Sequence, residues 1–259
     1  MRPGWNPVRR NRNIGTKAQG HGANNRMVIP ESWHELKRYW ENLSSYVLVR
    51  RLIGTKEQLF FVEPTKDGWF YPGTIDDLTV VLGACDRNAL ESFDFIVMRQ
   101  PTRKERLLCP VWGRAAFVFD IGNHHGSAIV IEAQSLGSYC WEKSLTPERS
   151  RELERIRSDG HPITIARRDI EISPTATSLR ATILYRTLLH EIGHRLDYRR
   201  STGEEWDGKT RAQKEDFAHR YAHETRVALT ANGRIPFDII ADDVSFESDG
   251  VKREWFVID

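Results

Sequence analysis

Apolar side chains recur in the last third of the chain with the three- and four-residue spacing of an amphipathic α-helix. The first run follows Thr175 and predicts a helix that reaches about Tyr198. Its apolar positions are Leu179, Ile183, Tyr185, Leu188, Leu189, Ile192 and Leu196. The polar segment 199–208 predicts a loop. A second apolar stripe then predicts a helix over about 210–231, stopped by Asn232-Gly233.

Earlier in the chain, Pro30 begins a predicted helix, and short β-branched and aromatic runs after it predict strands at 46–53, 59–63 and 93–98. The turn residues 66–68 precede Trp69-Phe70-Tyr71, which predicts a hairpin there. Thr74, with Asp77 three residues later, has the spacing of a capping box and predicts a short helix.

In the middle of the chain, apolar and polar positions also follow patterns typical of strands and helices. Runs at 115–120 and 127–133 predict a β-hairpin with a five-residue loop at 122–126, which contains His124 and His125. Thr146 followed by Pro147 predicts the start of a helix that ends by Gly160. Short strands are expected at 162–166 and 169–172, and the C-terminal stretch is expected to pack back onto the core.

Composition places the chain among globular proteins, since 39% of its residues are hydrophobic and 29% are charged. No apolar run predicts a membrane span or a secretory signal, so we expect no membrane partner and a cytoplasmic location. Three widely spaced cysteines, Cys85, Cys109 and Cys140, argue against a disulfide framework and are interpreted as buried apolar positions.

Charge is distributed unevenly. No acidic residue precedes Glu31, whereas the first 26 residues contain six basic side chains. We therefore expect residues 1–27 to be a disordered basic tail, 28–110 an N-terminal α/β subdomain and 111–259 the principal domain. Residues 1–26 have the charge to contact nucleic acid, but a solvated tail without a specific partner is the favoured interpretation.

The chemistry-bearing motif is His190-Glu191-Ile192-Gly193-His194 inside the first predicted helix. Side chains four residues apart lie on one helix face, so both imidazoles can reach one ion. Zn²⁺ favours nitrogen ligands, and its catalytic sites use three protein ligands and leave one position open. Glu191 is then placed to act as the general base on the zinc-bound water. Gly193, unfavourable within a helix, indicates close packing.

A third ligand is expected on the second helix. The extended pattern HExxHxxGxxH is excluded, because position 200 is Arg. Twenty residues separate His194 from Glu215, enough for a loop and an antiparallel return, and Glu215 lies beside the apolar stripe of that helix. Glu215 is therefore our candidate for the carboxylate of a His₂Glu zinc site.

These two segments, HEIGHRLD at 190–197 and EDFAHRYA at 215–222, resemble the gluzincin zinc metallopeptidases, in particular the HExGHxxD and ExFA pattern of lethal-factor-like catalytic domains. The similarity covers about fifty residues. It implies an α+β fold with a zincin-like core, in which a small mixed sheet packs on the HExxH helix and a second ligand-bearing helix. It also implies that Asp197 orients a ligating histidine. The first half of the chain resembles no family that we recognise.

The resulting hypothesis is a zinc metallopeptidase that cleaves a peptide or protein. His219 is a candidate second-shell donor or substitute ligand, and His219 with His223 forms an alternative histidine pair. Tyr198 and Tyr221 are candidates for the oxyanion donor, although core packing is the simpler role for each.

The sequence leaves two questions open: where the substrate binds and whether it is cleaved. If 127–133 is the sheet edge, an extended peptide can add to it as a strand, with His124 and His125 overlooking it. The alternative function is a zincin-fold module that binds without cleaving, with nucleic acid association through the basic tail as a further variant.

Overall fold

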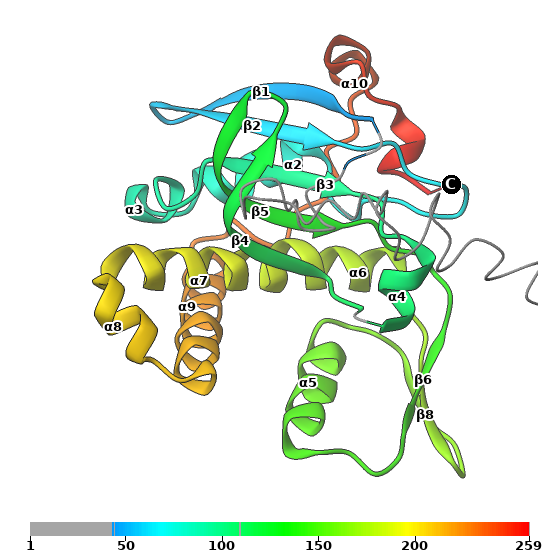
Figure 1. The fold of residues 1–259 in the computed structure, drawn as a ribbon. Coiled ribbons are helices and arrows are strands. Elements are labelled where there is room, and N and C mark those ends of the chain that lie inside the picture. The colour runs from blue at the N-terminus through cyan, green and yellow to red at the C-terminus, as the bar shows by residue number, and fades with distance from the viewer. Residues whose placement is uncertain (1–42, 44, 109, 259) are drawn as a thin grey trace, which may run out of the picture. The chain divides into compact units, whose positions relative to one another are not determined.

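The computed structural model describes residues 43, 45–108 and 110–258, which form an α+β fold (Figure 1). The predicted basic tail and the helix predicted from Pro30 lie outside the described residues. Glu41–Asp259 forms one compact unit. Within it, a five-stranded mixed sheet lies against a long helical segment, and a smaller three-stranded sheet carries its own helix.

The five-stranded sheet has the order β1-β2-β3-β5-β4. Its strands are β1 (Val47–Ile53), β2 (Lys56–Val62), β3 (Phe95–Arg99), β4 (Gly113–Ile121) and β5 (His124–Glu132). Pairing is parallel for β2 with β3 and for β3 with β5, and antiparallel at both edges. The strands predicted at 46–53, 59–63 and 93–98 are confirmed.

Two predicted hairpins differ from the structure. The one expected around residues 66–71 is wrong, because Phe70 forms only an isolated bridge to Gln134, and β2 pairs instead with β1 across a turn at Gly54. The second hairpin, β4 with β5, is confirmed, but its turn is shorter than expected. Ile121 pairs directly with His124, and Gly122 supplies the positive φ (57°) of a tight turn.

The neighbours of β5 change one further expectation. Of the segment predicted at 127–133, residues 127–132 belong to β5, which lies between β3 and β4, so β4 and not this segment forms the edge among the described strands. The pairing of β3 with β5 also joins residues on either side of position 110, where the sequence predicted a domain boundary. Strand pairing therefore runs across that position inside the compact unit.

The helices before the site are α2 (Ile75–Gly83), α3 (Arg87–Leu90), α4 (Arg103–Leu108) and α5 (Pro147–Ser158). Thr74 and Asp77 form the predicted capping box of α2, and Thr146 caps α5 as expected. The small sheet contains β6 (Tyr139–Glu142), β8 (Asp169–Ile172) and β7 (Ile163–Ile165) in that order. Apolar residues of α5 and β8 form a separate small core.

A long helical segment carries the motif. It consists of α6 (Ala176–Thr182), a π-helical turn η3 (Ile183–Thr187) and α7 (Leu188–Arg200). The predicted loop at 199–208 instead contains α8 (Gly203–Gly208), because Thr202 and Glu205 form a capping box. The predicted second helix is confirmed as α9 (Arg211–Ala231). The C-terminal elements are α10 (Asp243–Asp249) and η4 (Arg253–Trp255).

The core lies between the five-stranded sheet and this helical segment. Alternate residues of β2, β3 and β5 point into it together with apolar residues of η3 and α7, and Trp255 and Phe256 pack back as expected. Burial of this face fixes the orientation of α7, so the residues beside the apolar stripe face α9 or β4. In the described part of the chain, no helix combines the length and apolarity needed to cross a membrane.

Candidate metal centre

The imidazole rings of His190 and His194, both on α7, point toward the same position. The Nε2 atoms of His190 and His194 lie 3.1 Å apart, and the rings are nearly perpendicular, with an interplanar angle of 86°. Both side chains are mostly buried, with 14% and 15% of their surface exposed. Helical spacing predicted that they share a face, and the structure brings their nitrogen lone pairs together.

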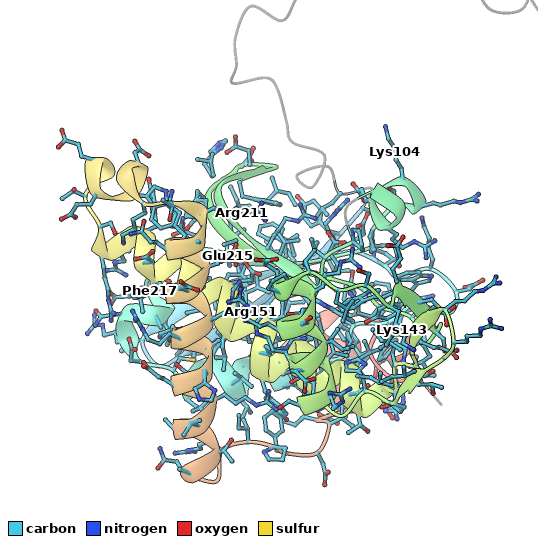
Figure 2. All side chains as sticks on the ribbon, turned by 90° about the horizontal axis from the view of Figure 1, so that it is seen from below. Lys104, Lys143, Arg151, Arg211, Glu215 and Phe217 are labelled. Carbon is cyan, nitrogen blue, oxygen red and sulfur yellow. The ribbon has the colours of Figure 1, made fainter. Side chains whose placement is uncertain are left out.

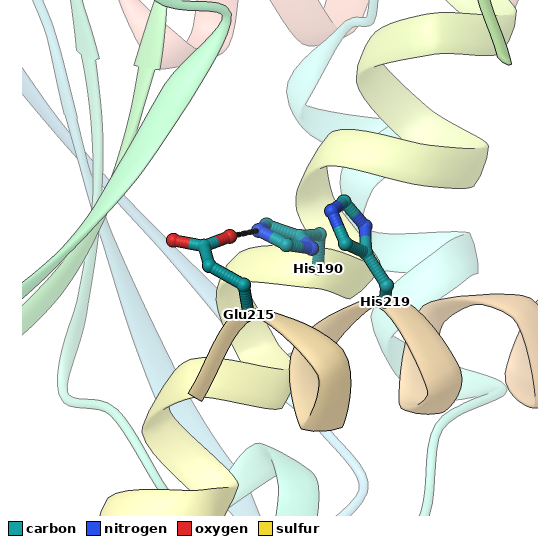
Figure 3. Close-up of side chains that lie close together, drawn as sticks. All are labelled: His190, Glu215 and His219. Atoms are coloured by element: carbon teal, nitrogen blue, oxygen red, sulfur yellow. Dashed lines mark ion pairs between the residues drawn. The ribbon is translucent and has the colours of Figure 1, made fainter. Parts of the chain in front are cut away.

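Glu215 reaches the same point from α9 (Figure 3). Its Oε2 atom lies 3.4 Å from His190 Nε2 and 3.7 Å from His194 Nε2. Gly193 allows this approach, since a Cβ there would lie only 2.9 Å from the Cα of Ala218 on α9. The glycine in the motif therefore lets the two helix backbones approach closely enough for Glu215 to meet the histidines.

The spacing of these three atoms fits a tetrahedral ion. Ligands at about 2.0–2.1 Å from Zn²⁺ in tetrahedral geometry are about 3.3–3.4 Å from one another. The three interatomic distances here are 3.1, 3.4 and 3.7 Å. One position can therefore be about 2 Å from all three donors at once, as a zinc ligand set requires.

His219, one helical turn after Glu215, also faces the cluster. Its ring centroid lies 4.3 Å from that of His190, and one ligand atom each from His190, Glu215 and His219 fall within 4.8 Å of one another (Figure 3). Two sets of three donors thus share His190 and Glu215. We favour the set with His194, because the distances between its three donor atoms match those around a tetrahedral zinc ion. The donor atoms of the set with His219 lie within 4.8 Å of one another, which is a looser arrangement.

Glu191 lies between α7 and the edge strand β4. Its side chain is buried, and it accepts a hydrogen bond from the backbone N–H of Ala115. Gly113 makes room for the helix, since a Cβ there would lie 2.9 Å from the Thr187 side chain and 2.8 Å from the carbonyl O of Val130. Sequence reasoning missed Gly113 and Ala115, for which a glycine at the start of a predicted strand was the only signal.

The electrostatics of the two glutamates differ. Burial raises the pKa of Glu191, although His190 and His194 oppose the rise. Hydrogen bonding to the same two histidines holds the pKa of Glu215 well below its usual range. Glu215 is therefore ionised and available as a ligand, whereas the Glu191 carboxylate accepts a proton more readily than an exposed one does.

The histidines also differ. Burial alone would lower the pKa of His194, but Glu215 and Glu191 raise it above its ordinary value. Burial, assisted by His190, lowers the pKa of His219 to about 3. His219 is therefore neutral across the physiological range and keeps a lone pair for a metal or a hydrogen bond.

Two of the weaker candidates, Asp197 and Tyr198, have their main contacts elsewhere. Asp197 is buried and accepts a hydrogen bond from Lys209 Nζ at 2.6 Å, not from either histidine. The ring of Tyr198 packs against Phe117 and Trp206. Asp197 therefore acts on His194 through its charge and not through a hydrogen bond, and the contacts of Tyr198 are those of packing.

Tyr221 and His223 are also outside the cluster. The Tyr221 ring packs on the α7 backbone at Gly193, and burial and Cys85 raise its pKa far above the usual value. His223 is exposed. Among the described residues, the single group of three or more metal-ligating side chains is the one around His190, so the alternative pair of His219 with His223 gains no third ligand.

Comparisons of the chain with protein-family models, with curated proteins and with solved structures give no significant match. We therefore infer the function from the chemistry of this site.

Proposed function

We propose that this protein is a zinc-dependent metallopeptidase. The observation that carries the proposal is the convergence of His190 Nε2, His194 Nε2 and Glu215 Oε2 at 3.1–3.7 Å, with the buried carboxylate of Glu191 beside them. Three protein ligands of this kind leave one position of a tetrahedral ion open, as catalytic zinc sites do. A purely structural zinc site would need neither an open position nor an adjacent base.

When bound, zinc would polarise the substrate carbonyl and make a water molecule acidic. The chain itself supplies the proton transfers. Glu191 takes the proton of the attacking water and later gives it to the departing amine, a role suited to a carboxyl whose pKa burial has raised. The hydrogen bond from the backbone N–H of Ala115 on β4 to Glu191 holds the carboxylate in place for both transfers.

A peptide suits this site because β4 is the edge strand of the sheet. An edge strand has unpaired backbone N–H and C=O groups, which an extended peptide can use to add as a further strand. Glu191 contacts β4 at Ala115, so a peptide on that edge would run past the base and the candidate ligands. This supports hydrolysis of an extended peptide segment.

The test combines metal analysis with Glu191→Gln. We expect the purified full-length protein to contain one zinc per chain and to cleave peptides in a proteome-derived library. Glu191→Gln should retain zinc and lose at least about a hundredfold of the cleavage rate, the usual size of general-base contributions. Glu224→Gln, an exposed position on α9, is the matched control and should match the wild type.

Two results would contradict the proposal. Absence of stoichiometric zinc would remove the metal centre. Zinc binding without cleavage of any library peptide would favour a module that binds without cleaving, the alternative that the sequence left open.

A further inference from the structure

A second feature adjoins the candidate metal centre. A cavity of about 270 Å³ opens between α5, η3 and α9, and His219 forms part of its wall. In Figures 1 and 2 α5 and α9 flank this region on the same side of the long helical segment. Its charged lining residues are Arg155, Arg186, Arg226 and Glu154, and the carboxylate of Glu154 is neutralised by Arg157 on the same helix.

The cavity wall has an excess of positive charge. Arg155 pairs with Glu152 at 3.1 Å, and Arg186 pairs with the other oxygen of Glu152 at 2.8 Å. Asp159 pairs with Arg186 at 2.6 Å and with Arg226 at 2.8 Å. Three guanidinium groups thus share two carboxylates, which leaves one positive charge uncompensated within the network.

One donor of this network is unused. The buried Nη2 atom of Arg186 has no hydrogen-bond partner among the described residues. A buried guanidinium N–H without an acceptor is costly, and Arg186 lies in the cavity wall.

We propose that this cavity is a subsite for a carboxylate of the peptide substrate, held by Arg155 and Arg186. The inference rests on the proposed peptidase function and names its substrate class: peptides with an acidic group close to the scissile bond. Guanidinium groups bind carboxylates through paired, charge-assisted hydrogen bonds, and the shared wall at His219 keeps such a group next to the metal centre. The carboxylate has two sources, an Asp or Glu side chain or the C-terminus of the peptide.

Binding is measured on the full-length, zinc-loaded Glu191→Gln protein, so that no peptide is consumed. The probes are N-acetylated, C-amidated alanine hexapeptides with a single Glu at each position in turn, their Gln counterparts, and an all-alanine hexapeptide with a free C-terminal carboxylate. We expect one Glu peptide or the free-acid peptide to bind at least about tenfold more tightly than its neutral counterpart, the effect of one charge-assisted interaction.

Arg155→Gln in the same background should remove this preference, and Arg155→Lys should restore part of it. Arg155 is 31% exposed, so both variants should fold, which zinc content and melting temperature will check. Arg50→Gln, an exposed arginine on β1, is the control and should keep the preference. Preference for a Glu peptide assigns the subsite to a side chain, and preference for the free acid assigns it to the C-terminus.

Equal binding of the acidic and neutral peptides at every position would overturn the inference, as would a preference that Arg155→Gln leaves intact. Failure of the peptidase proposal is distinguishable. Hydrolysis by the wild type without acidic preference would refute only the subsite, whereas carboxylate-selective binding without any hydrolysis would refute only the peptidase function.

Discussion

Two glutamates beside the same pair of histidines occupy opposite environments. Glu191 is buried against β4, and its pKa is raised by desolvation. Glu215 is 39% exposed, and hydrogen bonding to His190 and His194 lowers its pKa. Carboxyl groups whose environments separate their pKa values in this way are suited to different tasks. In the proposed function, this separation suits Glu191 to the role of base and Glu215 to the role of ligand.

That assignment predicts the effect of Glu215→Gln. The variant keeps the shape of the side chain but removes the negative charge, so zinc affinity should fall by more than the roughly 10–100-fold that loss of a second-shell partner costs. Competition with a chromophoric chelator measures the affinity. Glu224→Gln on the same helix is the control.

The choice between His194 and His219 as the third ligand can be tested in the same assay. His194→Ala should weaken zinc binding as strongly as Glu215→Gln, because its Nε2 lies 3.1 Å from that of His190. His219→Ala should have a much smaller effect. An equal or larger loss for His219→Ala would transfer the ligand role to His219.

Cysteine environments give an independent check of the packing. The sequence predicted that all three cysteines are buried, and this is wrong for Cys140, which is exposed on β6. Cys85 is half-buried, and desolvation raises the pKa of its thiol to about 12, whereas Cys109 lies outside the described residues. Since the thiolate is the reactive form, iodoacetamide at pH 8 should label Cys140 in the native protein and Cys85 only after unfolding. Peptide mass mapping would identify the sites, and rapid native labelling of Cys85 would contradict the packing of α2.

At the scale of elements, the approach of α7 to α9 depends on Gly193. In Gly193→Ala the new methyl group would meet the Ala218 backbone at 2.9 Å, and backbone cannot rotate away as a side chain can. Overpacking of this kind costs about 1–3 kcal/mol, partly offset by the better helix propensity of alanine. We expect a lower melting temperature and weaker zinc binding, because the helices must separate. Gly203→Ala on α8, where a Cβ meets nothing within 4 Å, should change neither.

Local sequence patterns predicted helices best where the sequence contains capping residues at the helix start. Capping boxes marked α2, and Thr146 with Pro147 marked α5. The π turn at Ile183–Thr187 was missed, because an extra residue in a helical turn barely disturbs an apolar stripe. The turn-like residues 66–68 were assigned to a hairpin, whereas β2 finds its partners in β1 and in the distant β3. The pairing of β2 with β3 is non-local and leaves no local signature, whereas β1 joins β2 through the short turn at Gly54.

At the scale of the molecule, the difference between local and non-local contacts also decides which residues of the site could be predicted from the sequence. His190, Glu191 and His194 could be predicted because one helix fixes their spacing, and Glu215 because a short loop returns the chain beside them. Tyr198 was a poor candidate since its direction depends on packing against Phe117 of β4. The arginine cavity could not be predicted, because it joins three elements that are distant in sequence.

Asp159 ties those elements together and provides a test of the whole arrangement. Its fully buried carboxylate accepts hydrogen bonds from Arg186, Arg226 and Thr182, and so connects the end of α5 to α6, η3 and α9. Asp159→Asn would leave Arg226 without its counter-charge and Arg186 with Glu152 alone, and removal of one partner from a buried ion pair costs about 3–5 kcal/mol. The free energy of unfolding, measured by urea denaturation, should fall by that amount.

The loss of stability in Asp159→Asn should also begin in one part of the molecule, at α5. Hydrogen exchange should quicken in α5 before it does in the five-stranded sheet, because α5 packs mainly on its own small core and loses its tie to the long helical segment. Glu148→Gln, which removes an exposed carboxylate 3.7 Å from Arg151 on the same helix, should leave the free energy of unfolding unchanged. A loss in Asp159→Asn as small as in this control would mean that α5 is held by its apolar contacts alone. The arginine cavity would then be a surface of α5 and α9 that no buried charge maintains.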